Sequence, residues 1–587
     1  MARPEAPDAP LPVNPRDFKT PNYGMTTFAD LFTNRQLVAL TTFSDLVGEA
    51  RDRIATDAKE AGLTPEGAES YANAVALYLG LANSGPLARN NTIATWDSGQ
   101  ASSRSSTGGS ARTEHVRSAF ARQALPMTWD FAEANPLSGS GGSLESGIKW
   151  LLPALERLGD GKSGVVRQQD AQRINMTGAA VSTDPPYYDN IGYADLSDFF
   201  YVWLRRSLGG IYPDVTATML TPKSEELVAT PYRFGGSKVK ADEHFERGFV
   251  RTFTRIREHQ ADGIPITVFY AFKQAESDEA GTASTGWETM LNGLIEAGLT
   301  VTATWPIRTE LSNRMIGRGT NALASSIVLV CRPCSRHAEA TTRRGFIAAL
   351  KDHLPGALRE LQQGSVAPVD LAQAAIGPGM AVFTSYSRVV EADGAEMTVR
   401  TALALINQVL DETLSEQEGD FDSDTRFCVK WFGQYAWDET DSGTADVLAR
   451  ATNTSIQGLQ RGGVFRAVAG KARLLSPEDL SESWDPLTDV RTSVWEVTLH
   501  LAKAVTERGS EAASALMGAA GQRVDLDAVK ELAYLLYNIC ERKGWTTSAL
   551  LFNGLGTSWS DLDAVARASA GKRNPVADTL NFDEEQG

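Results

Sequence analysis

The chain has 587 residues, long enough for several domains, and 56 lysines and arginines against 73 aspartates and glutamates give it a net charge of −17. This balance excludes a strongly basic nucleic-acid coat or a polybasic membrane binder, but it leaves open a nucleic-acid enzyme with a local basic groove. The composition is typical of a globular protein, and no uncharged apolar run reaches about 18 residues, so we expect no membrane segment. The start of the sequence lacks the apolar core of a signal peptide, and four cysteines are too few for a disulfide framework, so we expect a cytoplasmic protein.

The first part of the chain, residues 1–144, predicts an arm and a helical region. Residues 1–22 are rich in proline, which favours an extended arm. Residues 26–83 have helical periodicity, and residues 101–112 lack large apolar side chains, which indicates a loop. The expected apolar helix face consists of Leu31, Leu37, Leu40, Phe43 and Leu46.

Residues 145–335 show a different pattern, which predicts an α/β core. Helical or long segments separate strand-like runs rich in valine, isoleucine and threonine. Five such runs occur, at residues 163–171, 178–184, 263–273, 298–310 and 322–333. Only residues 311–321 separate the last two, which is too short for a helical crossover, so we expect those strands to pair antiparallel.

The remaining chain predicts a helical and mixed linker region at residues 336–480 and a C-terminal helical bundle at residues 481–587. It contains apolar helical faces but no catalytic constellation. Because an acidic surface repels DNA, we expect this region to stabilise assembly and to orient a target-recognition surface, and not to carry the main DNA groove.

The chemically informative motif is Asp184-Pro185-Pro186-Tyr187, which follows a small apolar strand. Two prolines must end that strand, which leaves Asp184 at its carboxyl end, where open α/β sheets bind ligands. An exocyclic amino group is a poor nucleophile, and two acceptors, the Asp184 carboxylate and the Pro185 carbonyl, would direct its lone pair. Tyr187 can stack on a flipped base. The alternative interpretation is a strand-terminating turn without chemistry.

The motif and its surroundings resemble a known family. DPPY is the fourth motif of S-adenosylmethionine-dependent amino-methyltransferases, and its aspartate form is similar to the adenine-N6 enzymes. Further segments resemble large adenine-specific DNA methylases that carry a zinc ribbon, some of which occur in phage-defence gene clusters and restriction-modification settings. These segments are residues 23–43, 120–136, 184–208, 220–228 and 553–563. The resemblance implies a Rossmann-like class I methyltransferase sheet with flanking helical regions, the cofactor S-adenosyl-L-methionine, DNA as substrate, and catalytic roles for Asp184, Pro185, Pro186 and Tyr187.

The resemblance also implies a cofactor role upstream of the motif. Residues 165–171 resemble the third motif of the family, a strand that ends in Asp170-Ala171. In that fold the aspartate and the following backbone N–H contact the cofactor, so Asp170, Ala171 and Asp184 are the expected cofactor-binding residues. The alternative is an ordinary aspartate that caps a turn.

Two expected parts of such an enzyme are missing from the sequence. None of the glycine-rich stretches follows a strand and opens a helix, as the cofactor turn requires; they are residues 138–143, 234–237, 377–380 and 461–464. Cys331 and Cys334 form a single CxxC pair, which favours reduced thiols over a metal site. The five runs correspond to strands three to seven of the usual sheet, and the missing first and second strands belong between the third and fourth. We therefore expect a split enzyme, a hetero-oligomer in which a second protein subunit supplies those strands and the glycine-rich turn.

Other functions stay open. The chain could be a non-catalytic DNA-binding or scaffold subunit of a defence complex, or a methyltransferase that acts on RNA or protein. Possible phosphate contacts are Lys223, Arg308, Arg314 and Arg318. The aromatic helix at residues 196–206 is better explained as a core face with solvated arginines than as a base-recognition element.

Overall fold

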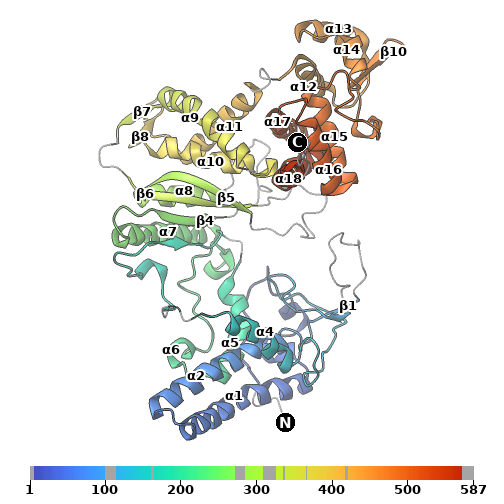
Figure 1. Ribbon diagram of the computed structural model, residues 1–587. Coiled ribbons are helices and arrows are strands. Elements are labelled where there is room, and N and C mark those ends of the chain that lie inside the picture. Colours follow the sequence, from blue (N-terminus) through green and yellow to red (C-terminus); the bar gives the residue numbers. More distant parts are fainter. Residues whose placement is uncertain are drawn as a thin grey trace, which may run out of the picture. The chain divides into compact units, whose positions relative to one another are not determined.

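The computed structural model describes residues 6–98, 114–159, 161, 164–188, 191–270, 285–308, 325–334, 338–364, 366–416 and 421–571. They belong to two compact units (Figure 1). Unit 1 comprises residues 1–174 and 186–252, and unit 2 comprises residues 175–185 and 253–587. This division differs from the four expected regions, because the expected boundary at residue 144 falls inside unit 1 and everything after residue 253 belongs to one unit.

Unit 1 is mainly helical. Its helices are α1 (Asn34–Glu60), α2 (Pro65–Ala82), α3 (Ser84–Leu87), α4 (Leu144–Glu156), α5 (Tyr193–Leu208), α6 (Pro213–Thr216) and the first part of α7 (Lys238–His259), and strands β1 (Trp96–Asp97) and β2 (His115–Val116) pair antiparallel. Helix α1 begins at a capping box, in which the Thr33 side chain accepts from the backbone N–H of Gln36 and the Gln36 side chain accepts in return. Helix α2 has its own cap, in which the Thr64 hydroxyl accepts from Gly67 N–H at 3.1 Å, so the predicted helical stretch is divided into separate helices.

The predicted apolar face of this stretch is partly wrong. Leu37 and Leu40 are buried, but Leu46 is 45% exposed, and Ser44 and Val47 are buried in its place. Leu31 belongs to a separate 3-10 turn, so counting from it carries the wrong phase into α1. Buried Ser44 is satisfied because its hydroxyl accepts from the Asn83 amide at 3.3 Å.

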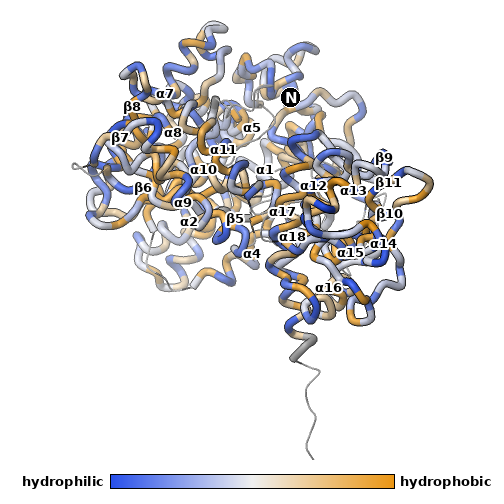
Figure 2. Tube along the Cα trace, turned by 90° about the horizontal axis from the view of Figure 1, so that it is seen from above, coloured by the Kyte–Doolittle hydropathy of each residue, from blue (hydrophilic) through white to orange (hydrophobic). Residues whose placement is uncertain are grey.

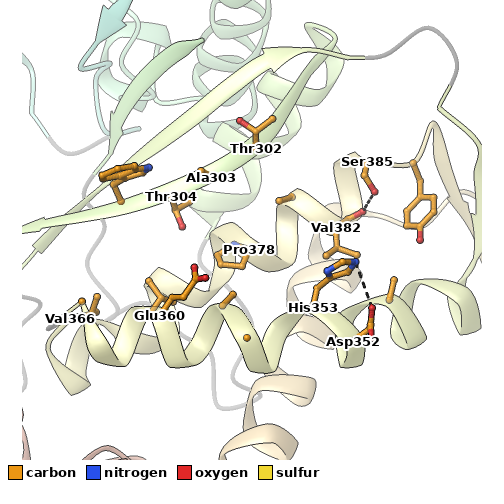
Figure 3. A pocket seen from close by; sticks show the side chains of 18 residues that line it. Thr302, Ala303, Thr304, Asp352, His353, Glu360, Val366, Pro378, Val382 and Ser385 are labelled. Carbon is orange, nitrogen blue, oxygen red and sulfur yellow. Dashed lines mark hydrogen bonds and ion pairs between the residues drawn. The ribbon is translucent and has the colours of Figure 1, made fainter. Parts of the chain in front are cut away.

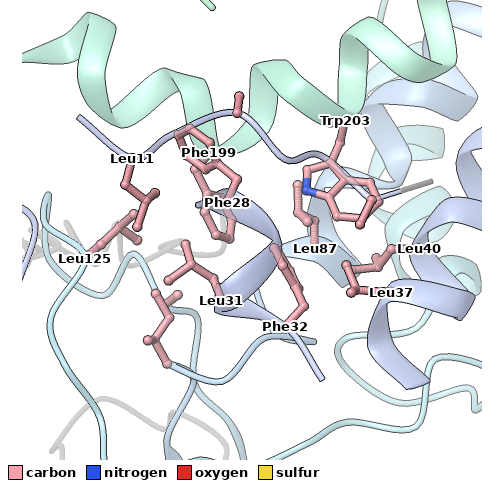
Figure 4. Close-up of a cluster of buried hydrophobic side chains, with 14 of the residues drawn as sticks. Leu11, Phe28, Leu31, Phe32, Leu37, Leu40, Leu87, Leu125, Phe199 and Trp203 are labelled. Carbon is pink, nitrogen blue, oxygen red and sulfur yellow. The ribbon is translucent and has the colours of Figure 1, made fainter. Parts of the chain in front are cut away.

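The N-terminal arm is part of the core of unit 1. Phe28, Phe199 and Trp203 are almost completely buried in one cluster, and Leu11 of the arm lies among them (Figure 4). The aromatic side chains of α5 therefore form a core face, as predicted for residues 196–206, and not a base-recognition surface. The arm holds its place by packing and by the backbone hydrogen bond from Leu11 N–H to the Thr26 carbonyl at 2.8 Å.

The sheet of unit 2 has the strand order β3-β4-β6-β5. Its members are β3 (Ser182–Thr183), β4 (Ile266–Tyr270), β5 (Leu299–Arg308) and β6 (Ser325–Pro333). Strand β3 is parallel to β4, with Ser182 opposite Thr267, and β6 is antiparallel to both β4 and β5. The predicted antiparallel pairing of the last two strands is confirmed, and β3 lies at the outer edge of the sheet.

The first of the five expected strands, at residues 163–171, is not formed within the described residues. Residues 164–170 have no ladder partner, and Val165 and Val166 are 78% and 98% exposed. An extended segment becomes a strand only when a neighbour accepts its backbone hydrogen bonds, and within the described residues no strand pairs with the outer edge of β3. The prediction that a strand delivers Asp170 is therefore wrong for the isolated chain.

Helices surround the sheet and fill the rest of unit 2. They are α8 (Thr285–Glu296), α9 (Arg343–Gln363), α10 (Pro368–Thr384), α11 (Val399–Glu416), α12 (Ser423–Tyr435), α13 (Ser442–Ala451), α14 (Ile456–Arg461), α15 (Val494–Glu507), α16 (Gly509–Ala520), α17 (Leu526–Lys543) and α18 (Thr546–Gly571). Helix α10 is tied to β5, since Val301 N–H donates to the Thr384 hydroxyl at 3.2 Å. Figure 2 shows hydrophobic and hydrophilic residues alternating along the C-terminal helices. Within the described parts of the chain, every helix is too short or too polar to span a bilayer.

Two further small sheets occur in unit 2. Strands β7 (Ala340–Thr342) and β8 (Arg388–Val390) pair in parallel. Strands β9 (Thr440–Asp441), β10 (Phe465–Val468) and β11 (Lys471–Leu474) form an antiparallel sheet in the order β10-β11-β9. This second sheet lies in the region expected to be a helical and mixed linker. Strands of two to four residues are too short to show a periodicity in sequence.

The C-terminal helices are not a separable bundle. The Tyr534 hydroxyl of α17 donates to the Val366 carbonyl, and Val369 N–H at the start of α10 donates to the Asn553 side chain of α18 at 3.2 Å. Pro368 also lies against Gly556, where an added methyl group would approach its ring to 2.4 Å. Helices α17 and α18 are therefore built into the same core as α9 and α10.

Candidate functional site

The Asp184–Tyr187 motif begins directly after β3. Asp184 is exposed, and Pro185, Pro186 and Tyr187 are half-buried. The strand stops because neither proline can donate a ladder hydrogen bond. Asp184 and Pro185 belong to unit 2, whereas Pro186 and Tyr187 belong to unit 1, so the motif is one of the places where the chain passes between the units.

Tyr188, which follows the motif, fixes the direction of the chain in unit 1. Its φ of 52° is in the left-handed region, and its hydroxyl donates to the Asp242 carboxylate at 2.5 Å. Its ring lies edge-on to Phe245 at 5.3 Å, and its carbonyl accepts from Ala229 N–H at 3.0 Å. Tyr188 could not be singled out from the sequence, because nothing in the sequence pattern distinguishes an anchoring tyrosine from a stacking one. Three contacts on Tyr188 set the position from which Tyr187 emerges.

A buried polar cluster lies at the start of α5. Asp195 is 1% exposed, and its carboxylate accepts from the Tyr232 hydroxyl at 2.7 Å and from Asn14 Nδ2 at 3.2 Å. Arg233 Nη2 lies 3.3 Å from the same oxygen. Burial, together with the bond to Asp195, raises the pKa of the Tyr232 hydroxyl well above its usual value. The negative charge of the buried Asp195 carboxylate is thus compensated by Arg233 and by two neutral hydrogen-bond donors.

The same arginine links a second acid to the cluster. Arg233 Nη1 lies 2.6 Å from Glu226 Oε2, and Glu226 Oε1 accepts from the N–H of Ala194 at 2.9 Å. Buried charges that neutralise one another hold the residues after the motif against residues 226–233. The cluster could not be found from the sequence, because its members are distant in sequence; the available signal was that the resembling segments 184–208 and 220–228 contain its two acids, Asp195 and Glu226.

This cluster lines a pocket of about 550 Å³ in unit 1. The walls include residues 10–13 of the arm, Lys223, Tyr232 and His244. Ala229 hydrogen-bonds Tyr188 and lies three residues before Tyr232, so one short segment connects the motif with the pocket. An apolar wall with a few convergent polar groups is the usual form of a small-ligand or base-binding pocket.

Lys223 has a structural partner. Its Nζ lies 2.6 Å from Oδ2 of Asp198, which is completely buried and also accepts from the N–H and hydroxyl of Thr221 at 2.8 and 2.7 Å. The lysine therefore compensates a buried charge, which favours a structural role over a phosphate contact. The other phosphate candidates, Arg314 and Arg318, lie outside the described residues, as does the side chain of Arg308.

Asp170 caps a turn. Its carboxylate accepts from Gln172 N–H at 2.9 Å, and it precedes the 3-10 turn Ala171–Arg173. Arg173 Nε lies 3.6 Å from the other carboxylate oxygen. This geometry matches the turn-capping alternative for the isolated chain. The cofactor role of Asp170 and Ala171 stays a prediction.

A larger pocket, of about 1030 Å³, lies at the other edge of the sheet (Figure 3). Strand β5 and helices α9 and α10 form it, with Thr304, His353 and Glu360 among its side chains. Because β5 and β3 are opposite edge strands, this pocket is remote from Asp184. We assign it no role in the chemistry of the motif.

The CxxC pair does not form a metal centre within the described residues. Cys331 is buried on β6, where burial raises the pKa of its thiol to about 12, and Cys334 is exposed. No group of three or more histidine, cysteine, aspartate or glutamate side chains gathers as potential ligands in the described parts of the chain.

Comparison with known proteins gives one match. A family described as "Domain of unknown function (DUF8807)" matches residues 422–580, which is the C-terminal part of unit 2 and excludes the motif. No curated protein and no solved structure matches the chain.

Proposed function

We propose that the chain is the DPPY-bearing subunit of a split S-adenosylmethionine-dependent DNA methyltransferase that modifies adenine N6, acting in the cytoplasm to mark host DNA for phage defence. A second protein subunit completes its sheet. The proposal depends on one observation, the strand order β3-β4-β6-β5 with Asp184 at the carboxyl end of the edge strand β3.

The topology supports the proposal through its order and direction. In the class I sheet that the resemblance implies, the last strand in sequence is antiparallel and lies between the two strands before it. Here β6 is antiparallel to β4 and β5 and lies between them. Strand β3 then takes the place of the fourth strand of seven, and its open edge is the side on which the missing strands belong. Exposed Val165 and Val166 fit a third strand that has no neighbour without the partner.

The residues of this chain would act on the amino group of a flipped base. The Asp184 carboxylate and the Pro185 carbonyl accept its two N–H bonds and make the nitrogen lone pair directional, while Tyr187 stacks on the ring. The rigid prolines fix both acceptors before the substrate arrives.

The described residues do not by themselves form a cofactor site. None of their strands leads through a glycine-rich turn into a helix, and Asp170 is engaged in capping its own turn. S-adenosylmethionine supplies a methyl group to the acceptor when bound, and the proposal assigns most of its binding surface to the partner subunit.

The test is methyl transfer by the assembled enzyme. The chain is mixed with the product of the neighbouring gene, and methyl-labelled S-adenosylmethionine is followed into DNA. Asp184→Ala should lower the rate by about 100-fold or more, since it removes a preorganised acceptor. Asp262→Ala is the matched control, because Asp262 is an exposed aspartate that precedes β4 and so lies toward the other end of the parallel pair.

Two alternatives make different predictions. A scaffold subunit predicts that the complex methylates DNA equally well with Asp184→Ala. An RNA or protein methyltransferase predicts label in those substrates and none in DNA. A pair that binds cofactor but methylates none of the three would contradict the proposal.

A further inference from the structure

Residues 440–474 form a helix-turn-helix followed by a β-hairpin. Helix α13 is joined to α14 by the four residues 452–455, a turn of the length found in helix-turn-helix motifs. Asn453 adopts a left-handed φ of 61° within it. Strands β10 and β11 then form a hairpin with a two-residue loop, and β11 pairs back to β9, which immediately precedes α13. We call residues 440–474 the hairpin module.

The hairpin module has its own packed interior. Leu459 of α14 and Phe465 of β10 are buried. Phe465 meets the rings of Phe427 and Trp431 of α12 edge-on at 5.1 and 4.9 Å. These contacts hold α14 and the hairpin in one orientation, and they leave the other faces of both in solvent.

The turn between α13 and α14 is fixed by an ion pair. Arg491 Nε lies 2.6 Å from Asp424 Oδ2, and the Thr454 hydroxyl of the turn donates to the other oxygen of Asp424. Arg491 also lies under α14, since a methyl group added at Gly458 would approach its guanidinium carbon to 2.7 Å. A helix held this closely is a rigid platform for recognition.

The charge of the hairpin module is opposite to that of the chain. Residues 440–474 contain five basic residues and two acidic residues, a net charge of +3, whereas the whole chain carries −17. Four of the basic side chains are exposed, and they are Arg450, Arg461, Arg466 and Lys471. Lys471 is 3.2 Å from Asp441, but both side chains are more than half exposed, so that pair contributes little neutralisation.

The exposed faces carry the residue types that duplex recognition uses. Gln457 and Arg461 lie on the solvent side of α14, opposite buried Gly458 and Leu459, whereas the exposed Gln460 donates its amide N–H to the Ala467 carbonyl of the hairpin at 3.2 Å. Glutamine and arginine read adenine and guanine edges in the major groove. Arg466 and Lys471 lie on the two strands of the hairpin, where side chains can reach phosphates that flank the groove.

We infer that the hairpin module is a duplex-DNA binding site, with α14 directed to the major groove and the hairpin to the adjacent backbone. The inference goes beyond methyl transfer, because it places a DNA contact in a part of unit 2 that contains none of the motif residues. It departs from the expectation that the C-terminal region does not carry the main DNA groove, since a charge averaged over that region hides a local basic excess.

The test measures binding by the full chain without cofactor or partner. Fluorescence anisotropy with a labelled duplex of about 30 base pairs should show binding. The logarithm of the association constant should fall linearly with the logarithm of the salt concentration. The double variant Arg461→Glu, Arg466→Glu should weaken binding by about tenfold or more and reduce the magnitude of the salt slope by about 2. The control, Arg344→Glu with Arg359→Glu, makes the same charge change at two exposed arginines of α9 and should bind as the wild type does.

Three outcomes would overturn the inference. The first is that the wild-type chain does not bind duplex DNA, and the second is that both double variants weaken binding equally. The third is that the Arg461→Glu, Arg466→Glu variant binds duplex DNA normally but no longer associates with the partner subunit. The last would identify a protein interface. Circular dichroism of each variant separates loss of binding from loss of fold. Since no cofactor or methyl transfer is involved, failure here leaves the test on Asp184 unaffected.

Discussion

Ala469 is the residue of the β10–β11 hairpin whose backbone least suits its side chain. It and Gly470 form the two-residue loop, with φ values of 54° and 80°. Such type I′ loops favour Asn-Gly, and a non-glycine L-residue in the left-handed region costs about 1–2 kcal/mol. The side chain is exposed, so the cost comes from the backbone and not from a contact.

Ala469→Asn should therefore stabilise the hairpin by about 0.5–1 kcal/mol, because asparagine tolerates this conformation better than alanine. Hydrogen exchange of the amides of β10 and β11 should slow, and the midpoint of thermal unfolding should not fall. Ala467→Asn, two residues earlier in a strand, is the control and should give no gain, since asparagine is unfavourable there. Equal protection in both variants would show that the loop is not strained.

Among the elements, the α13–α14 turn depends most on a single ion pair. Asp424 is 7% exposed, and burial by itself would raise the pKa of its carboxyl. The hydrogen bonds from Arg491 and Thr454 outweigh this effect and hold the pKa below its usual value. The stabilisation is present above the unfolded pKa and is lost as the pH falls through the lower folded value.

Asp424→Asn should lower the stability of unit 2 by about 2 kcal/mol, a value reduced because Arg491 is 41% exposed. Urea denaturation at pH 7 measures the loss, and the difference from wild type should shrink below pH 4 as Asp424 takes up a proton. Asp446→Asn, at an exposed position on α13, should have almost no effect. A loss that is constant down to pH 3 would contradict the role of the charge.

The elements also show where sequence reasoning succeeds and where it fails. Strands β4, β5 and β6 are predictable from the sequence, because each is a run of five to ten residues rich in β-forming side chains. The run at residues 163–171 has only two β-forming residues, Val165 and Val166, and residues 164–170 have no ladder partner; the sequence does not report whether a partner strand exists. The motif could be located from two prolines and a tyrosine, whereas Tyr188 and the Asp195–Arg233 cluster depend on contacts between distant segments.

For the molecule as a whole, two buried groups of α15 make opposite contributions to the dependence of stability on pH. Burial, reinforced by nearby Asp489, raises the pKa of Glu496 to about 9. Burial, with nearby Lys503 and Arg508, lowers the pKa of His500 to about 4, and its ring stacks on Trp484 at 4.0 Å. Both groups are therefore neutral in the folded chain near neutral pH.

The signs of these two shifts are opposite. Glu496 has a raised folded pKa, so its contribution is complete below the ordinary value of 4.5 and is lost as the pH rises toward 9. His500 has a lowered folded pKa, so its contribution is complete above the ordinary value of 6.5 and is lost as the pH falls toward 4. Between 4.5 and 6.5 the two slopes cancel, which predicts a plateau with a decline on either side.

Glu496→Gln should remove the decline on the alkaline side, because a neutral amide keeps the shape of the protonated acid and cannot ionise. Near pH 4 the two should be equal, and at pH 8 the variant should be more stable than wild type by up to about 5 kcal/mol, since each of the roughly 3.5 pH units between the ordinary value of 4.5 and pH 8 contributes at most about 1.4 kcal/mol. His500→Gln should flatten the acid side instead and leave the alkaline side unchanged. Urea midpoints followed by tryptophan fluorescence from pH 4 to 9 distinguish these outcomes. If Glu496→Gln shifted stability equally at every pH, ionisation of this carboxyl would not set the alkaline limit, and the acidic surface that gives the chain its charge of −17 would be the better explanation.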